Sequence, residues 1–195
     1  MLHKNAQTMK KAIIEGDTYA PAEDVYDFFM DFENYGKYSE YVESVRVVED
    51  GDYPEWEINF RWWIVRYAAR SKLVDYEDGE YIEWQVTKDV DVHGMWKFEE
   101  VGDEHTHVEL ELLYDPKGAS KANPLTFFPT KRLIQMARPV VDSHVSKVLR
   151  RVAAEVEGEP REIDYTIRPA DPTENDEFLA LVPDEKVQPD ETIQD

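Results

Sequence analysis

The chain has 195 residues, no cysteine, and 43 acidic against 22 basic side chains, which gives a formal net charge of −21 at pH 7. The missing thiols exclude a disulfide framework, a cysteine nucleophile and a thiolate metal site, and the negative charge disfavours binding to nucleic acid or to anionic membranes. Because 42% of the residues are hydrophobic, no run approaches the roughly 20 apolar residues of a membrane span, and the N-terminus lacks an apolar leader, we expect a folded cytoplasmic protein without membrane insertion.

The first elements are predicted to be a strand and a helix. Residues 8–18 are typical of a strand, and Ala20-Pro21 ends it. Proline suits the first turn of a helix, and apolar residues follow at helical spacing, which predicts a helix from Pro21 to about Asp31 with Val25, Phe28, Phe29 and Phe32 on one side. A short second helix is predicted around residues 37–42.

From residue 44 to residue 114 the hydrophobic period changes to two, which is the period of half-buried strands. Turn sequences such as Asp50-Gly51-Asp52 separate the segments. The pattern predicts six strands joined by short turns, hence an antiparallel meander with one apolar face, at residues 44–49, 56–64, 67–76, 82–86, 92–98 and 106–114.

Strand parity decides which charged residues enter the core. Arg61 alternates with the tryptophans of its strand and is expected outside. For the strand at 67–76 either parity fits the pattern, and we favour the one that places Leu73 inside and Arg70 outside because it buries no charge.

A long helix is predicted from about Thr130 to Glu157, with a kink at Pro139 and a C-cap at Gly158. Beyond it, residues 158–195 carry 12 acidic and 3 basic side chains and five of the eleven prolines. This composition predicts a mostly disordered acidic tail whose only docking candidate is the apolar cluster at 178–182. The predicted organisation is one domain over residues 1–157 and a tail over residues 158–195.

Residues 1–157 keep a net charge of −12 without the tail, so the folded part is itself acidic. Two interpretations stay open. The chain is either a salt-adapted, halophilic protein, whose dense surface carboxylates keep it hydrated in concentrated salt, or an acidic protein of an ordinary cell.

The order of strand, helix, meander and long helix predicts an α+β fold. The C-terminal helix is the one predicted element long enough to cover the apolar face of the sheet. Since several tryptophans on that face hinder close packing, we expect a mostly apolar cavity between helix and sheet.

Two stretches carry a resemblance to a known family. Ala20-Pro21-x-x-x-Val25-Tyr26-x-x-Phe29-x-Asp31-Phe32-Glu33-Asn34-Tyr35 resembles the opening of START-like (SRPBCC) proteins of the polyketide cyclase/dehydrase and coenzyme Q-binding group. Gly94-x-Trp96-x-Phe98 and Thr106-x-Val108-x-Leu110-x-Leu112 resemble the paired late strands of the same group. The resemblance covers about residues 8–157.

The resemblance implies a helix-grip fold, in which a curved antiparallel sheet of six to seven strands wraps around a long C-terminal helix and encloses an apolar cavity. Family members bind lipids, quinones or polyketides, and some are cyclases or ribosome-associated factors. On this basis the predicted ligand-binding residues are the apolar and aromatic side chains expected to face the cavity, together with one histidine: Trp56, Ile58, Phe60, Trp62, Trp84, Trp96, Phe98, Leu110, Leu112, Phe127, Phe128, Met136, Val140 and His144.

Two histidine patterns are candidates for chemistry. His144 lies in the apolar stripe of the long helix, where it is either a ligand contact or general acid/base or a core histidine bonded to a neighbour. His105-x-His107 has a spacing that could hold a metal, but this face alternates with Val108 and Leu110. We therefore expect both imidazoles to point to solvent and predict no metal site.

Three functions fit these predictions. The favoured one is non-enzymatic binding of a hydrophobic small molecule, such as an isoprenoid quinone or a lipid. The second is a cyclase, aromatase or dehydratase acting in the same cavity, and the third is a ribosome-associated interaction module, which the charge disfavours in dilute conditions. The sequence holds no phosphate loop, dinucleotide fingerprint or nucleophile triad, so no cofactor is predicted.

Overall fold

The computed structural model describes residues 9–62, 65–88, 91–114 and 146–169. Within these ranges the strands form one eight-stranded sheet in the order β2-β3-β4-β5-β6-β7-β1-β8, and every neighbouring pair is antiparallel. The predicted meander is confirmed. The strands are β1 (Lys10–Thr18), β2 (Val42–Glu49), β3 (Glu55–Trp62), β4 (Val65–Glu77), β5 (Tyr81–Val86), β6 (Val92–Gly102), β7 (His105–Tyr114) and β8 (Tyr165–Pro169).

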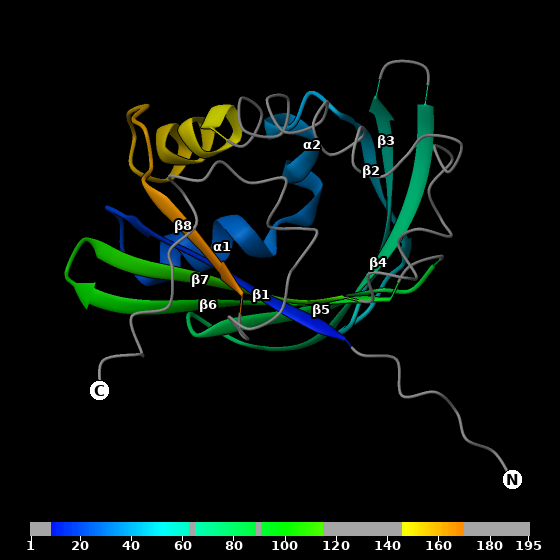
Figure 1. Cartoon of the computed structure of the whole chain (residues 1–195), viewed down its shortest axis with the longest axis horizontal. Coiled ribbons are helices and arrows are strands. Elements are labelled where there is room, and N and C mark those ends of the chain that lie inside the picture. Colours follow the sequence, from blue (N-terminus) through cyan, green and yellow to red (C-terminus); the bar gives the residue numbers. More distant parts are fainter. Residues whose placement is uncertain (1–8, 63–64, 89–90, 115–145, 170–195) are drawn as a thin grey trace, which may run out of the picture.

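The sheet curves around the helices, which lie on its concave side (Figure 1). These are α1 (Ala22–Met30), the single turn η1 (Phe32–Asn34), α2 (Tyr35–Tyr38) and a helix over residues 146–156. The last is the end of the predicted C-terminal helix, whose earlier part lies outside the described residues. The arrangement is the α+β helix-grip class. No helix in the described part of the chain is both long and apolar enough to cross a membrane.

Helix α1 forms where the sequence signals place it. Pro21 is its N-cap residue, and Glu23 and Asp24 occupy the first turn. Carboxylates stabilise a helix at this end because the helix dipole is positive there. Val25 and Phe29 are buried against the sheet. The helix therefore fixes one end of the space that the sheet encloses.

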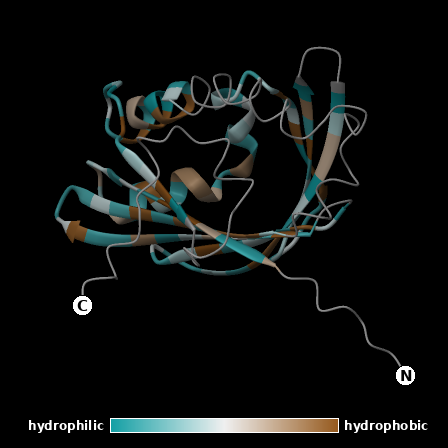
Figure 2. Ribbon diagram, in the orientation of Figure 1, coloured by the Kyte–Doolittle hydropathy of each residue, from teal (hydrophilic) through white to brown (hydrophobic). Residues whose placement is uncertain are grey.

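Aromatic side chains build the core between α1, η1 and the sheet. Phe29 lies on Trp96 with ring centroids 4.3 Å apart, and Phe32 stacks on Trp56 at 4.2 Å. Hydrophobic residues accordingly recur along the strands between polar ones (Figure 2). The strand β4 follows the favoured parity, since Ala69, Ser71 and Leu73 are buried.

The convex face of the sheet carries ion pairs across neighbouring strands. Lys97 of β6 lies 3.0 Å from Glu109 and 2.8 Å from Glu111 of β7, and Lys11 of β1 lies 2.8 Å from Glu111. Arg61 is exposed and pairs with Glu43 at 3.1 Å, as its predicted outward position requires. Charged side chains thus predominate on the convex face, whereas the concave face is mainly apolar.

The eighth strand corrects the predicted domain boundary at residue 157. Strand β8 pairs with β1 from Gly16↔Tyr165 to Ala12↔Pro169, and Ile163, Tyr165 and Ile167 are buried. The domain therefore reaches at least residue 169, and the sheet has one strand more than the six to seven expected. The predicted cluster at 178–182 lies outside the described residues.

Candidate functional site

A cavity of about 430 Å³ lies on the concave side, between the sheet and the helices. Its lining comes from the strands β1, β2, β3, β6 and β7, from α1, η1 and α2, from the helix over 146–156, and from β8 with the segment that leads into it. Most of these side chains are aromatic or aliphatic. They are Ile14, Phe28, Phe29, Tyr35, Tyr38, Val42, Ile58, Phe60, Trp96, Val108, Leu110, Val148, Leu149, Val152, Ile163 and Tyr165, with Glu15, Gly16, Thr18, Asn34 and Ser39 beside them.

Four of the sequence-predicted ligand residues line this cavity, namely Ile58, Phe60, Trp96 and Leu110. Four others belong to the described strands but not to the described lining: Trp56, Trp84, Phe98 and Leu112. Trp56 and Phe98 are occupied in core packing, because Phe32 stacks on the first and Tyr26 and Phe29 contact the second.

The remaining predicted residues cannot be placed on the cavity from the described part of the chain. Trp62 belongs to β3, but its side chain lies outside that part, as do Phe127, Phe128, Met136, Val140 and His144. Their roles as ligand contacts, and that of His144 as candidate acid/base, stay predictions.

Sequence reasoning missed two groups of lining residues. Phe28, Tyr35 and Tyr38 belong to the α1–α2 region, from which the sequence predicted no ligand-binding residue. Ile163 and Tyr165 belong to the predicted tail. The period-two pattern Ile163, Tyr165, Ile167 was a strand signal, but acidic and proline-rich composition after residue 158 outweighed it in the prediction.

One polar group of the cavity wall is fully engaged within the protein. The Tyr35 hydroxyl donates to the carbonyl oxygen of Phe29 at 3.2 Å, which satisfies a carbonyl in the last turn of α1, and it also hydrogen-bonds the Trp96 side chain. Burial raises the pKa of this hydroxyl above the usual tyrosine range, and the Trp96 bond offsets part of that rise. Tyr35 therefore stays neutral and serves the fold.

Glu15 is likewise committed outside the cavity. Its carboxylate accepts from the Thr166 hydroxyl at 3.3 Å and lies 3.5 Å from the Arg168 guanidinium, on the convex side of β1 and β8. The remaining ionisable side chains of the described lining are the three tyrosines. The cavity wall, as far as it is described, is suited to a neutral guest.

Trp84 lies on the concave face directly opposite Gly94 of β6. A Cβ atom at Gly94 would lie 2.2 Å from Cζ2 of Trp84, so the indole occupies the space that a side chain at Gly94 would need. The buried Nε1 of Trp84 finds no hydrogen-bond acceptor among the described residues. A buried donor without a partner costs about 1–3 kcal/mol, which makes this N–H a candidate contact for an acceptor atom.

The two strand histidines point away from the cavity. His105 Nε2 and His107 Nδ1 lie 3.3 Å and 3.1 Å from the same carboxylate oxygen of Asp17 on the outer surface. The described residues hold no group of three or more side chains arranged to bind a metal ion. The predicted outward orientation of the His105-x-His107 pair is confirmed.

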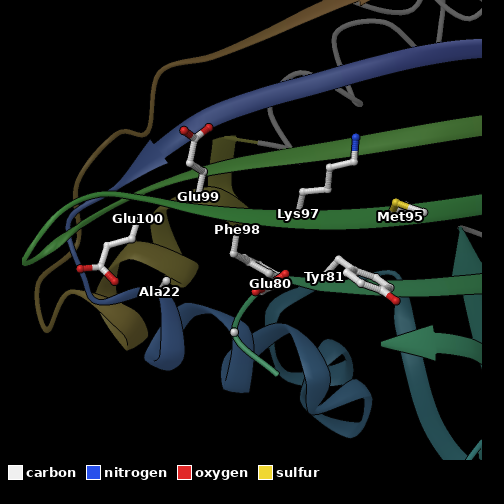
Figure 3. A pocket seen from close by; sticks show the side chains of 9 residues that line it. Ala22, Glu80, Tyr81, Met95, Lys97, Phe98, Glu99 and Glu100 are labelled. Carbon is white, nitrogen blue, oxygen red and sulfur yellow. The ribbon is translucent and has the colours of Figure 1, made fainter. Parts of the chain in front are cut away.

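A wider depression of about 540 Å³ lies where the edge of β6 runs past the β4–β5 turn. Its side chains come from both faces of the sheet, since Lys97 and Glu99 leave β6 on one side and Phe98 on the other (Figure 3). Glu80 and Glu100 add charge. An apolar guest gains little burial here, so we assign the candidate site to the smaller apolar cavity.

Solved structures with the same architecture come from several bacteria. A protein from Thermus thermophilus is 20% identical over 76% of this chain and 97% of its own, with a TM-score of 0.57. The Zhui aromatase/cyclase from Streptomyces sp. R1128 is 20% identical over 77% and 94%, with a TM-score of 0.58. A START superfamily protein from Mycobacterium smegmatis is 13% identical over 76% and 98%, with a TM-score of 0.56. At these identities the likeness shows the fold alone.

The family assignment comes from the sequence itself. The family model described as polyketide cyclase / dehydrase and lipid transport matches residues 19–140, more than half of the chain, whereas no curated protein matches significantly. The matched range includes the α1 motif and strands β2 to β7. The chain therefore belongs to the polyketide cyclase / dehydrase and lipid transport family.

Proposed function

We propose that this protein binds a hydrophobic small molecule in the cavity between its sheet and helices and does so in the cytoplasm. The observation that carries the proposal is the apolar lining of a cavity of about 430 Å³, which lies within the range of small-molecule sites, roughly 300–1,000 Å³. The polar groups Tyr35 and Glu15 are already bonded within the protein. Binding there is driven by removing apolar ligand surface from water.

Blocking the cavity tests this proposal. Ile58 lines the cavity, and the next residue, Asn59, is partly exposed and hydrogen-bonds Ser44 on the outer face. Ile58→Trp is expected to weaken binding of the neutral fluorescent probe N-phenyl-1-naphthylamine at least tenfold, whereas Asn59→Trp leaves it unchanged. Equal binding by both folded variants would place the probe elsewhere and sink the proposal. Native mass spectrometry of the purified protein then identifies any retained natural ligand.

Within this class we favour an apolar ligand that carries a hydrogen-bond acceptor, such as an isoprenoid quinone. The support is the buried indole N–H of Trp84, which has no acceptor within the described part of the chain. Trp84 lies on the concave face but outside the described lining, so the ligand that we propose reaches beyond that lining to the indole. Trp84→Phe keeps an aromatic ring and removes the donor. It should lower the affinity for 2-decyl-1,4-benzoquinone by about 0.5–1.5 kcal/mol and leave decylbenzene, which lacks carbonyl groups, unaffected. A parallel loss for both compounds would show that Trp84 contributes packing only.

A second candidate is a cyclase- or aromatase-type reaction in the same cavity. It is favoured by the family model and by the likeness to the Zhui aromatase/cyclase. Such a reaction requires a positioned acid or base, and the candidate in this chain is His144. His144→Phe is expected to reduce turnover of a polyketide-type substrate about 10²–10⁴-fold with a smaller change in binding if the protein is an enzyme. An unchanged rate would remove His144 from the chemistry.

A further inference from the structure

The segment after the helix over 146–156 returns along the cavity and becomes the last strand of the sheet. We call residues 157–169 the C-terminal strap. Gly158 has φ +84°, a left-handed conformation that glycine adopts at helix ends without steric cost. The strap then runs antiparallel to β1. It lies beyond residue 140, where the match to the family model ends.

Arg161 fastens the start of the strap to β1. Its guanidinium donates to both carboxylate oxygens of Glu157, at 2.6 Å and 2.7 Å, and to the backbone carbonyl of Asp17 at 2.8 Å. It also lies over the ring of Tyr19, 4.3 Å from the centroid. Glu157 in turn accepts from the Tyr19 backbone N–H at 3.0 Å. Two-oxygen pairing of this kind fixes direction as well as position.

The strap approaches β1 closely at Gly16, where there is no room for a side chain. A Cβ atom at Gly16 would lie 2.9 Å from the carbonyl oxygen of Asp164, so the glycine allows the two backbones to approach. This approach brings Ile163 and Tyr165 into the cavity wall. Ile167, two residues further along the same face, is buried to the same degree, 6% exposed against 7% for Ile163, but it does not line the cavity.

We propose that the C-terminal strap is the wall that sets the size of the bound ligand. Ile163 and Tyr165 are its specificity-determining residues, and Arg161 is a positioning residue that holds them in place. The proposal rests on the proposed function, since it concerns the same cavity. It predicts that the size of ligand accepted changes with the strap while the α1–α2 side of the cavity stays the same.

The test compares two probes of different size, naphthalene and pyrene, by displacement of N-phenyl-1-naphthylamine from the full-length protein. Ile163→Ala removes three carbon atoms from the wall and so enlarges the cavity. It is expected to raise the affinity for pyrene relative to naphthalene about tenfold, which is the low end of what even one methylene group achieves in an apolar pocket. Ile163→Phe should shift the ratio in the opposite direction. Ile167→Ala, which removes the same atoms from an equally buried site, should leave the ratio unchanged.

Arg161→Gln tests the positioning role by the same ratio. A general loss of stability would weaken both probes together, whereas a displaced wall changes their ratio, and circular dichroism confirms that each variant is folded. If the unaltered protein binds neither the fluorescent probe nor the two hydrocarbons, the proposed function itself fails. If it binds them and the Ile163 and Ile167 variants show the same ratio, the strap does not set ligand size and the inference is overturned.

Discussion

At the scale of single residues, the packing of the sheet depends on a glycine, Gly94, that leaves room for the indole ring of Trp84. Gly94 faces Trp84 across β5 and β6. A methyl group on Gly94 would lie 2.2 Å from the indole, which leaves no room for any side chain. Gly94→Ala is expected to lower the free energy of unfolding by about 1–3 kcal/mol, the cost of overpacking a core. Urea denaturation followed by tryptophan fluorescence measures it.

The control for this change lies on the same strand. A Cβ atom at Gly102 would meet its nearest neighbour, His105 Cβ, at an ordinary 3.6 Å. Gly102→Ala is therefore expected to be neutral or slightly stabilising, because alanine restricts the unfolded chain. Equal losses of stability in both variants would mean that Trp84 does not require the glycine.

A second residue-scale prediction concerns Tyr26 at alkaline pH. Burial, and secondarily the nearby Asp78, raises the pKa of the Tyr26 hydroxyl from 10.0 to about 12, and the hydroxyl donates to Asp78 at 3.2 Å. Below pH 10 the folded and unfolded states both keep the proton. Between pH 10 and about 12 the unfolded state releases it first, so the folded state loses stability as the pH rises.

Urea midpoints measured from pH 8 to pH 11.5 test this dependence. Tyr26→Phe is expected to decline less steeply above pH 10 than the unaltered protein, since one linked proton has been removed. Tyr53→Phe, at an exposed tyrosine, should follow the unaltered curve. Identical slopes for all three proteins would show that Tyr26 titrates alike in both states.

At the scale of elements, two truncations distinguish the strap from the rest of the predicted tail, residues 170–195. Ending the chain after residue 169 is expected to leave the thermal midpoint nearly unchanged. Ending it after residue 158 removes β8, the Arg161 contacts with Glu157 and Asp17 and three buried apolar residues, and should lower the midpoint by more than about 5 °C. A comparable drop with the longer chain would show that residues beyond 169 contribute packing of their own.

The elements that the sequence predicted well are those with a regular period. Alternation from residue 44 to residue 114 defines β2 to β7, and it also places Arg61 and the His105-x-His107 pair outside. The strand β8 was missed because its five residues give too short a pattern to outweigh the composition around them. The cavity was predicted from the number of large rings, but which rings face it depends on three-dimensional contacts, such as the stacking of Phe32 on Trp56.

At the scale of the whole molecule, charge dominates the expected response to salt. The excess carboxylates behind the net charge of −21 repel one another. This repulsion extends about 10 Å at 0.1 M salt, the Debye length, but only about 3 Å at 1 M. Raising KCl from 0.1 M to 2 M should therefore increase the free energy of unfolding. Differential scanning fluorimetry across this range measures the trend.

A fall in the free energy of unfolding with rising KCl would also have a structural cause. The ion pairs of Lys97 with Glu109 and Glu111 are partly exposed, and salt weakens such pairs. Stability that is greatest in dilute buffer would therefore contradict the salt-adapted interpretation and favour an acidic protein of an ordinary cell.

The predominance of charged side chains on the convex face and of apolar ones on the concave face has a consequence for how this protein can change. Glu57 lies 2.6 Å from Arg46 on the outer surface, while the adjacent Ile58 lines the cavity. Neighbours in the chain therefore face either the surrounding water or the bound ligand. Free-energy changes at sites more than about 7–10 Å apart that share no contacts are usually additive, a condition that outer residues away from the cavity lining meet. Outer substitutions that tune the protein to a new salt or pH should therefore leave guest selection intact, and the two properties can evolve, or be engineered, independently.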